Sequence, residues 1–97
     1  MSYELLTALD AQRIADIFLA AIQSGITQPL VFVGEPVEFV GGWLYLYDTE
    51  RHVRTGDISA ALGGNGPIAV FSRGRVELLD TASSVEKHVE RLNAAAT

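Results

Sequence analysis

The side chains suited to acid–base or nucleophilic chemistry are few and scattered along this chain. His52 and His88 are the only histidines, and a hydrolytic site would need one of them beside a serine and a carboxylate. Ser59 and Ser72 are the candidates, but neither lies in the sequence context of an activated serine nucleophile. A metal site is equally weakly indicated, because neither histidine has a second imidazole or thiolate three or four residues away. We therefore predict no catalytic residues, no metal and no cofactor.

A glycine-rich segment over residues 63–67 is the next feature that could bind a ligand. Consecutive backbone N–H groups in such turns can form an anion-binding nest. The segment lacks the Lys-Ser/Thr pair of a nucleotide-binding loop, and it leads into a strand instead of a helix. The main prediction is a structural turn, in which Gly64 and Gly66 permit unusual backbone angles and Pro67 begins the next strand. The alternative is a contact loop that meets a partner through Asn65.

Three large rings, Trp43, Tyr45 and Tyr47, are spaced by two along a β-prone stretch, so they share one face of a strand. One alternative places this row in the core, with Leu44 and Leu46 pointing outward. The other places it on an open face, where Tyr and Trp are favoured anchors for a partner. A mixed arrangement, in which Trp43 is buried and one tyrosine edge reaches the surface, is favoured over a fully exposed row, and the core position stays open beside it. Both tyrosines are therefore partner-binding candidates, and Trp43 is a structural one.

Four acidic residues, Glu35, Glu38, Asp48 and Glu50, are predicted at one end of the early strands. Such charges are usually a solubilising rim. If they share one face, they would steer a basic partner and raise its association rate, with an effect that weakens as salt increases. Glu35 and Glu38 are accordingly added to the partner-binding candidates.

Two helices at the ends of the chain must help to position these residues. The first is predicted over residues 9–24, with Thr7 as its cap and Gly25 as its stop. The last opens with a capping box formed by Ser83 and Glu86.

Short β-rich runs lie between the helices, and Pro36 argues for an edge position where it falls. The predicted runs are 29–33, 37–40, 43–47, 68–71 and 76–79, with a brief pairing of 51–54 and one helical turn capped by Asp57. This order predicts an α+β domain, in which an antiparallel sheet of about four to five short strands carries an N-terminal and a C-terminal helix packed on one face.

Composition sets limits on partners and compartment. The 97 residues leave room for one domain, 1–97, with one core. A net charge of −5 disfavours nucleic-acid backbones and anionic membranes, because each contact would bring carboxylates near phosphates. The chain has no cysteine, no leader-like amino terminus and no apolar stretch of the about 18 residues that a membrane span needs. We expect a soluble cytoplasmic protein with a basic protein partner.

Several segments together resemble the immunity protein 35 family, a small α+β domain found beside bacterial polymorphic toxins. The matching residues are Gly42-Trp43 with Tyr45 and Tyr47, Thr55-Gly56-Asp57, the stretch 62–70, Thr81-Ala82 and Val85-Glu86. The resemblance covers residues 30–92. One departure is the short turn at 72–75, which lacks the acidic residue expected near it.

This resemblance implies a bacterial protein that binds and neutralises a cognate toxin, with no catalytic residues to carry over. Toxins linked to the family often carry peptidase domains, so a peptidase-type toxin is the expected target. Two alternatives stay open. One is a chaperone-like or peptide-binding module that uses the sheet edge near Pro36, and the other is a small-ligand pocket between helix and sheet. An uncovered sheet face or edge would also allow a homodimer.

Overall fold

The computed structural model describes residues 5–62 and 66–95. This part of the chain forms an elongated molecule of 48 × 25 × 20 Å. Its elements, in chain order, are α1 (Ala8–Gln23), β1 (Leu30–Phe32), β2 (Val37–Phe39), β3 (Gly42–Tyr45), β4 (Tyr47–Thr49), α2 (Glu50–Thr55), the 3₁₀ helix η1 (Ile58–Ala60), β5 (Ile68–Phe71), β6 (Val76–Leu78) and α3 (Val85–Ala95).

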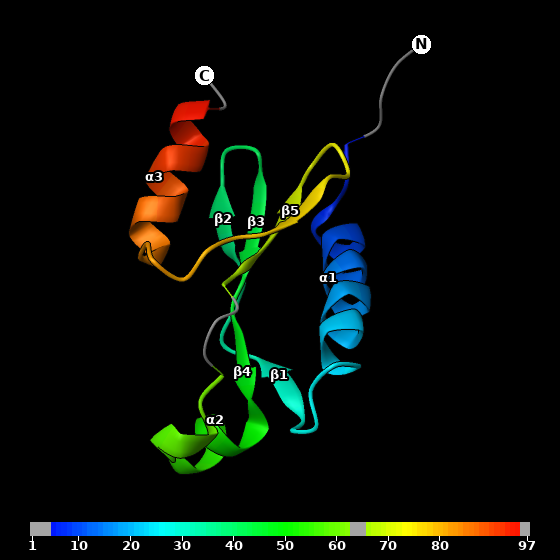
Figure 1. The fold of residues 1–97 in the computed structure, drawn as a ribbon. Coiled ribbons are helices and arrows are strands. Elements are labelled where there is room, and N and C mark those ends of the chain that lie inside the picture. The colour runs from blue at the N-terminus through cyan, green and yellow to red at the C-terminus, as the bar shows by residue number, and fades with distance from the viewer. Residues whose placement is uncertain (1–4, 63–65, 96–97) are drawn as a thin grey trace.

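The strands form two antiparallel sheets. The larger sheet has the order β2-β3-β5-β6, and the smaller one pairs β1 with β4. Figure 1 shows α1 on one side of the larger sheet and α3 on the other. The predicted α+β class, the antiparallel pairing and the two terminal helices are confirmed.

The two helices cover opposite faces of the sheet, so the prediction that both pack on one face is wrong. Ile68 and Val70 of β5 belong to the core cluster under α1, whereas Ala69 and Leu44 belong to the cluster under α3. The physical reason is that side chains alternate across a strand. The two central strands are buried on both faces, and a sheet that is apolar on both faces needs a cover on each.

The row of rings faces α1. Tyr45 is 3% exposed, and Trp43 and Tyr47 are half-buried in the same cluster. The ring centres of Tyr45 and Phe32 lie 5.7 Å apart. Leu44, which the first alternative placed outward, is fully buried under α3. A fully exposed row is also excluded, because the rings pack under α1, and Tyr45 takes the buried position that the mixed arrangement gave to Trp43. The reason is the position of α1, which lies over the middle of the row, with Ala11 and Ala15 fully buried in the same cluster.

The hydroxyl of Tyr47 is buried and has no hydrogen-bond partner among the described residues. Burial raises the pKa of Tyr47 to about 12. A buried, unpaired hydroxyl costs roughly 1 to 3 kcal/mol of stability. We therefore expect Tyr47→Phe to raise the free energy of unfolding by about 1 kcal/mol, with Tyr45→Phe as the control that removes the same atom from the next ring. Urea unfolding measures both, and a less stable Tyr47→Phe variant would contradict the prediction.

The first four strands form one long, bent hairpin. Phe32 pairs with Tyr47 in the smaller sheet, and Val37 pairs with Leu44 in the larger one. Residues 33–36 therefore stand opposite only residues 45 and 46, and Gly34 takes a positive φ of 69° in this bend. The unequal lengths break the ladder and let the smaller sheet turn away from the larger one.

The local details of the helices partly match the prediction. Thr7 caps α1 in a capping box with Asp10, although the helix ends at Gln23 with Ser24, and not Gly25, as its C-cap. Asp57 caps η1 as predicted. The last helix is different, because the Ser84 hydroxyl accepts the hydrogen bond from Lys87 N at 3.2 Å, so Ser84 replaces Ser83 as its cap.

The sequence suggested that residues 51–54 pair briefly as a strand, but in the structure they are part of α2. The Thr49 hydroxyl caps this helix by accepting a hydrogen bond from His52 N, and Gly56 ends it at a φ of 73°. A capping threonine followed by a left-handed glycine is a local helix signal that outweighed the β-prone residues between them.

Candidate partner-binding site

One end of the molecule is a small lobe formed by β1, β4, α2 and η1, which we call the arm (Figure 1). The arm stands out from the larger sheet at the bend of the long hairpin. Its helix α2 contains no buried residue, so α2 adds almost nothing to a core. An element that is ordered without being buried must be held by polar contacts.

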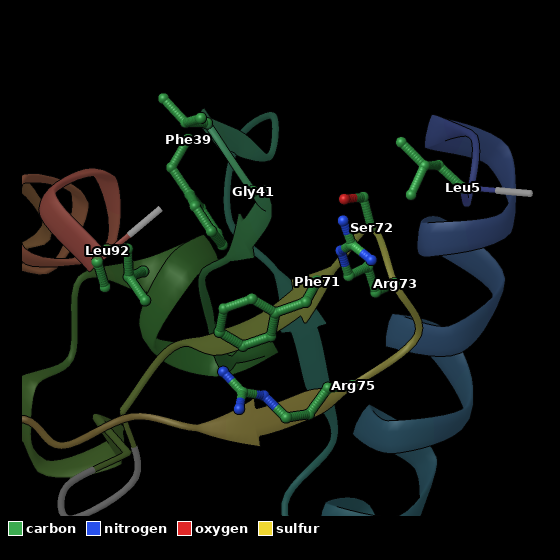
Figure 2. Close-up of a pocket in the computed structure, with 10 residues that line it drawn as sticks. Leu5, Phe39, Gly41, Phe71, Ser72, Arg73, Arg75 and Leu92 are labelled. Carbon is green, nitrogen blue, oxygen red and sulfur yellow. The ribbon is translucent and has the colours of Figure 1, made fainter. Parts of the chain in front are cut away.

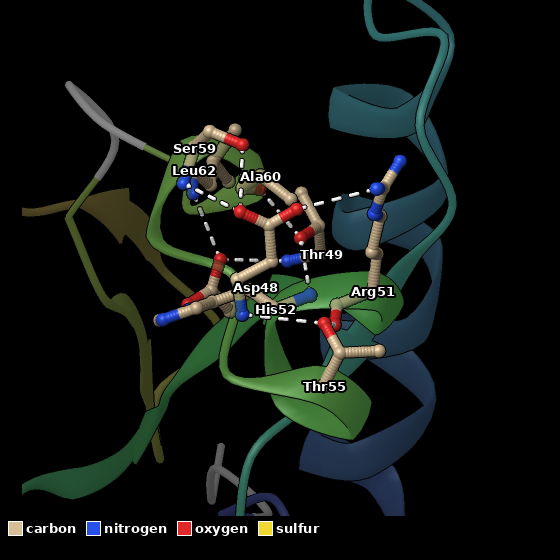
Figure 3. Close-up of polar contacts among 9 residues, drawn as sticks. Asp48, Thr49, Arg51, His52, Thr55, Ser59, Ala60 and Leu62 are labelled. Carbon is tan, nitrogen blue, oxygen red and sulfur yellow. Dashed lines mark hydrogen bonds and ion pairs between the residues drawn. The ribbon is translucent and has the colours of Figure 1, made fainter.

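Asp48 is the centre of these contacts (Figure 3). Its Oδ1 accepts hydrogen bonds from Thr49 N at 2.7 Å and Leu62 N at 2.8 Å, and its Oδ2 lies 2.5 Å from Nδ1 of His52. The buried Thr49 hydroxyl donates to Ala60 O at 2.6 Å. Asp48 and Thr49 thus connect β4, α2, η1 and the segment after η1 with side-chain bonds.

A second group of contacts fixes η1 against α2. Asp57 accepts hydrogen bonds from the backbone and hydroxyl of Ser59, and its Oδ2 lies 3.3 Å from the Arg51 guanidinium. The Thr55 hydroxyl donates to Arg51 O at 2.7 Å. These contacts hold the outer surface of the arm in one shape, which is the condition for recognition at low entropic cost.

The network also sets the charge state of Asp48. Burial on its own would raise the pKa of Asp48, but the hydrogen bonds from Leu62 N, His52 and Thr49 N favour the carboxylate, and the pKa is lowered overall. A carboxyl group with a lowered pKa in the folded state stabilises the fold above its unfolded pKa of about 3.9, and this stabilisation is lost as the pH falls through the folded pKa.

We therefore expect Asp48→Asn to destabilise the protein by about 1 to 3 kcal/mol near neutral pH. The difference between wild type and variant should shrink as the pH is lowered from about 5 through the lowered pKa, because both then carry a neutral group. Urea unfolding at a series of pH values checks this. A pH-independent difference would show that the charge of Asp48 plays no part, and Glu50→Gln in the same arm is the control for a merely exposed carboxylate.

The outer surface of the arm carries two exposed apolar side chains. Ile58 of η1 is 82% exposed and Val53 of α2 is 51% exposed. Glu50 and Arg54 lie on the same short helix, with 4.0 Å between their charged groups. Rigid apolar side chains with a charged rim are typical of the surface at which one protein binds another.

The tyrosines named from the sequence lie beneath α1 and not on an open face. Tyr45 is part of the core, and Tyr47 directs its hydroxyl into the interior. Trp43 is half-buried in the same cluster. These rings therefore shape the sheet and support the root of the arm through β4.

The four acidic residues do not gather at one end, which corrects that expectation. Glu38 stands opposite Trp43 in the larger sheet, whereas Asp48 stands opposite Val31 in the smaller one. Glu35 lies in the bend between the two sheets. The bent hairpin spreads them along its length, and Asp48 turns inward to its hydrogen bonds. Glu35, Glu38 and Glu50 are exposed.

The glycine-rich loop lies partly outside the described residues, and this applies to Gly64 and Asn65. Its end is described: Gly66 is buried and Pro67 is half-buried. Pro67 O accepts a hydrogen bond from Leu79 N at 2.9 Å, which extends the β5–β6 ladder by one residue. Pro67 thus lies at the start of the β5–β6 ladder, and the structural role of Gly66 and Pro67 stays a prediction.

The sheet edge near Pro36 is largely closed. Asn93 of α3 accepts a hydrogen bond from Val40 N at 2.8 Å, just past the end of β2. In an antiparallel strand every second N–H points the same way, so Pro36 and Glu38 share the outward direction of Val40. Pro36 has no N–H to donate, and the N–H of Val40 is bonded to Asn93. The backbone N–H of Glu38 is therefore the one outward donor left in this stretch, and it lies beside the carboxylate of the same residue. Edges of this kind resist strand addition.

The side chains that could do chemistry are engaged elsewhere. Ser59 donates to Asp57 and not to a histidine. His88 is fully buried, where Nδ1 accepts from the Arg91 guanidinium at 2.7 Å and Nε2 donates to Asp80 O at 2.9 Å. Among the described residues no cluster of three or more His, Asp and Glu side chains could hold a metal, and no helix is long and apolar enough to cross a bilayer.

The fold and the arm thus define a small α+β domain whose ordered polar network supports an exposed surface. The model of the Immunity protein 35 family matches residues 9–91, and the chain belongs to this family. No curated protein and no solved structure matches the chain.

The sequence prediction missed Ile58 and Val53. Isoleucine and valine are residue types that are most often buried, so nothing in their identity pointed to the surface. The one local signal was the helical turn capped by Asp57, which was recognised but not connected with recognition.

Proposed function

We propose that this protein binds a cognate toxin and neutralises it by direct protein–protein contact. The observation that carries the proposal is the family match over residues 9–91. The arm supports it, because Ile58 and Val53 are exposed on a lobe held rigid by the Asp48 network. A peptidase-type toxin remains the proposed target, and the compartment in which the two meet is proposed to be the cytoplasm.

In this proposal Ile58 is the central anchor and Val53 adds apolar contact area. Burying a fully exposed isoleucine is worth about 1.5 to 3 kcal/mol, or roughly ten- to a hundredfold in affinity. Glu35, Glu38 and Glu50 are exposed, and we propose that they steer a basic toxin toward the molecule. Tyr45 and Tyr47 act through the fold, and Asn65 stays a proposed contact.

The alternative of a peptide-binding module that adds a strand near Pro36 is less well supported. Asn93 bonds to Val40 N, and the remaining outward donor lies beside the carboxylate of Glu38. This leaves no continuous edge of free backbone groups at β2 for a peptide to pair with. A homodimer remains a proposal with no contact on which to place it.

The test is calorimetric titration with the catalytically inactivated product of the neighbouring reading frame. We expect a one-to-one complex with a Kd in the nanomolar range, about −12 kcal/mol. Ile58→Asp should weaken it by at least about tenfold. Ile17→Asp is the matched control, since Ile17 is 71% exposed and lies on α1, outside the arm.

The outcomes of this titration test both direct neutralisation and the use of the arm. If the wild type does not bind, direct neutralisation is wrong. If the wild type binds and Ile58→Asp binds equally well, the toxin uses another surface than the arm. Association rates of Glu35→Lys and Glu38→Lys at two salt concentrations test steering, because a steering charge changes the association rate and its salt dependence more than the dissociation rate.

A further inference from the structure

A cavity of about 570 Å³ lies at the tip of the β2–β3 hairpin (Figure 2), and Figure 1 shows this tip at the end of the molecule opposite the arm. It lies between the tip of the β2–β3 hairpin, the β5–β6 turn and the last turns of α3. We call it the hairpin groove, and the residues that matter here are Leu5, Phe39, Val40, Phe71, Arg73, Arg75 and Leu92. Its volume is within the range of sites that bind small molecules and side chains.

The floor and walls of the hairpin groove are apolar. The rings of Phe39 and Phe71 meet edge to face with 5.5 Å between their centres, and Leu92 lies on the α3 side. Val40 is 71% exposed and Leu5 is 57% exposed at the rim. Large apolar side chains around one concave surface favour an apolar occupant, because each excludes water when the groove is filled.

The charge of the groove is opposite to that of the chain. Arg73 and Arg75 line it, and none of its described lining residues is acidic, although the chain carries a net charge of −5. Figure 2 shows the Arg75 guanidinium beside the Phe71 ring, and it lies 4.3 Å from the ring centre. Its ion pair with Glu77 is long, at 3.8 Å, and both side chains are solvent-exposed. Such an exposed ion pair contributes little to stability, so a second carboxylate could bind to the same guanidinium.

The groove is preformed, because backbone bonds join its walls. Ser72 N donates to Gly41 O, and Phe71 N donates to Arg75 O, each at 2.8 Å. Leu6 N donates to Ser72 O at 2.8 Å, which ties the segment before α1 to the β5–β6 turn. The Asn93 side chain ties α3 to the hairpin tip through Val40 N. A ligand would therefore pay little ordering entropy.

We propose that the hairpin groove binds a short peptide segment in which a bulky apolar side chain is flanked by Asp or Glu. The apolar side chain packs on Phe39 and Phe71, and the flanking carboxylate pairs with the guanidinium of Arg75, supported by Arg73. The site lies at the opposite end from the arm, so the peptide and the toxin can be bound at the same time. The inference does not depend on the identity of the toxin.

The test uses fluorescence anisotropy with labelled pentapeptides of the form Gly-Glu-X-Glu-Gly, where X is Leu, Phe or Trp. The matched probes replace both Glu residues by Lys. We expect saturable binding of at least one acidic peptide, at least about tenfold tighter than its Lys counterpart, and weaker at high salt. Amide chemical shifts should move at Val40, Ser72 and Gly74 and stay unchanged in the arm.

Charge reversal makes the proposal falsifiable. Arg75→Glu should lose the acidic peptide and gain affinity for the Lys peptide, with a smaller change for Arg73→Glu. Arg54→Glu in the arm is the control, because it removes the same charge from an exposed ion pair elsewhere. Thermal melts check that each variant is folded. No saturable binding of any acidic peptide, or equal binding by Arg75→Glu, would overturn the proposal. Self-association that Arg75→Glu abolishes would assign the groove to a second copy of the chain instead.

Discussion

Gly42→Ala is expected to destabilise the protein by about 3 kcal/mol or more. A Cβ at this position would collide with Val70 O and lie 2.9 Å from the Cα of Phe71. Both atoms belong to the backbone of β5, so no side chain can rotate away to make room. The clash can be relieved only by separating β3 from β5, the two central strands of the larger sheet. The loss is a large part of a total stability of about 5 to 15 kcal/mol.

The neighbouring glycine is the matched control. A Cβ on Gly41 would meet only the Phe39 ring, with its nearest atom at 3.5 Å, which is ordinary contact. Gly41→Ala should therefore change stability by less than about 1 kcal/mol, since alanine also lowers the entropy of the unfolded chain. Urea unfolding followed by circular dichroism compares the two. Equal effects at both positions would show that the pairing of β3 with β5 does not set the requirement.

Paired glycines also show what the sequence could and could not predict. Gly41 lies at the tip of the β2–β3 hairpin and Gly42 begins β3, but in the sequence they are identical neighbours. Which of the two is indispensable depends on β5, which lies more than twenty residues further along the chain. Local patterns determined the elements that depend on local contacts, such as the Thr7 cap of α1 and the β5–β6 hairpin.

The sequence predictions failed where contacts between distant segments of the chain determine the structure. The alternation of Leu44 and Tyr45 indicated a strand with two different faces, but it could not show that a helix covers each of them. The acidic residues at 35, 38, 48 and 50 are close in sequence, and the bend at Gly34 spreads them in space. Residue type alone does not distinguish Ile58, which is exposed, from Ile68, which is fully buried.

The candidate sites show the same division between local contacts, which the sequence could predict, and contacts between distant segments, which it could not. Asp57 and its helical turn could be predicted, because the capping bond spans two residues. The role of Asp48 could not, since its bonds reach Leu62, fourteen residues away. The hairpin groove joins segments from both ends and the middle of the chain, so no sequence pattern marks it.

Gly66→Ala is the second substitution with a large expected effect, again about 3 kcal/mol or more. The sequence suggested that this glycine permits unusual backbone angles, and that stays a prediction. The structure gives a separate reason for glycine at position 66, because other backbone atoms approach it closely. A Cβ would collide with Leu79 O and lie 2.6 Å from Asp80 O. Both are backbone atoms just after β6, and they cannot move without shifting the segment that leads into α3.

The shift would reach the buried histidine, because Asp80 O accepts the hydrogen bond from His88 Nε2 at 2.9 Å. We therefore expect Gly66→Ala and His88→Gln to be non-additive in urea unfolding, with the double variant less destabilised than the sum of the singles. Gly25→Ala is the control, since its Cβ would meet only Ile22 O at 3.8 Å. Strict additivity would mean that the strain stays at β6. Coupling would mean that Gly66 positions α3, and with it one wall of the hairpin groove.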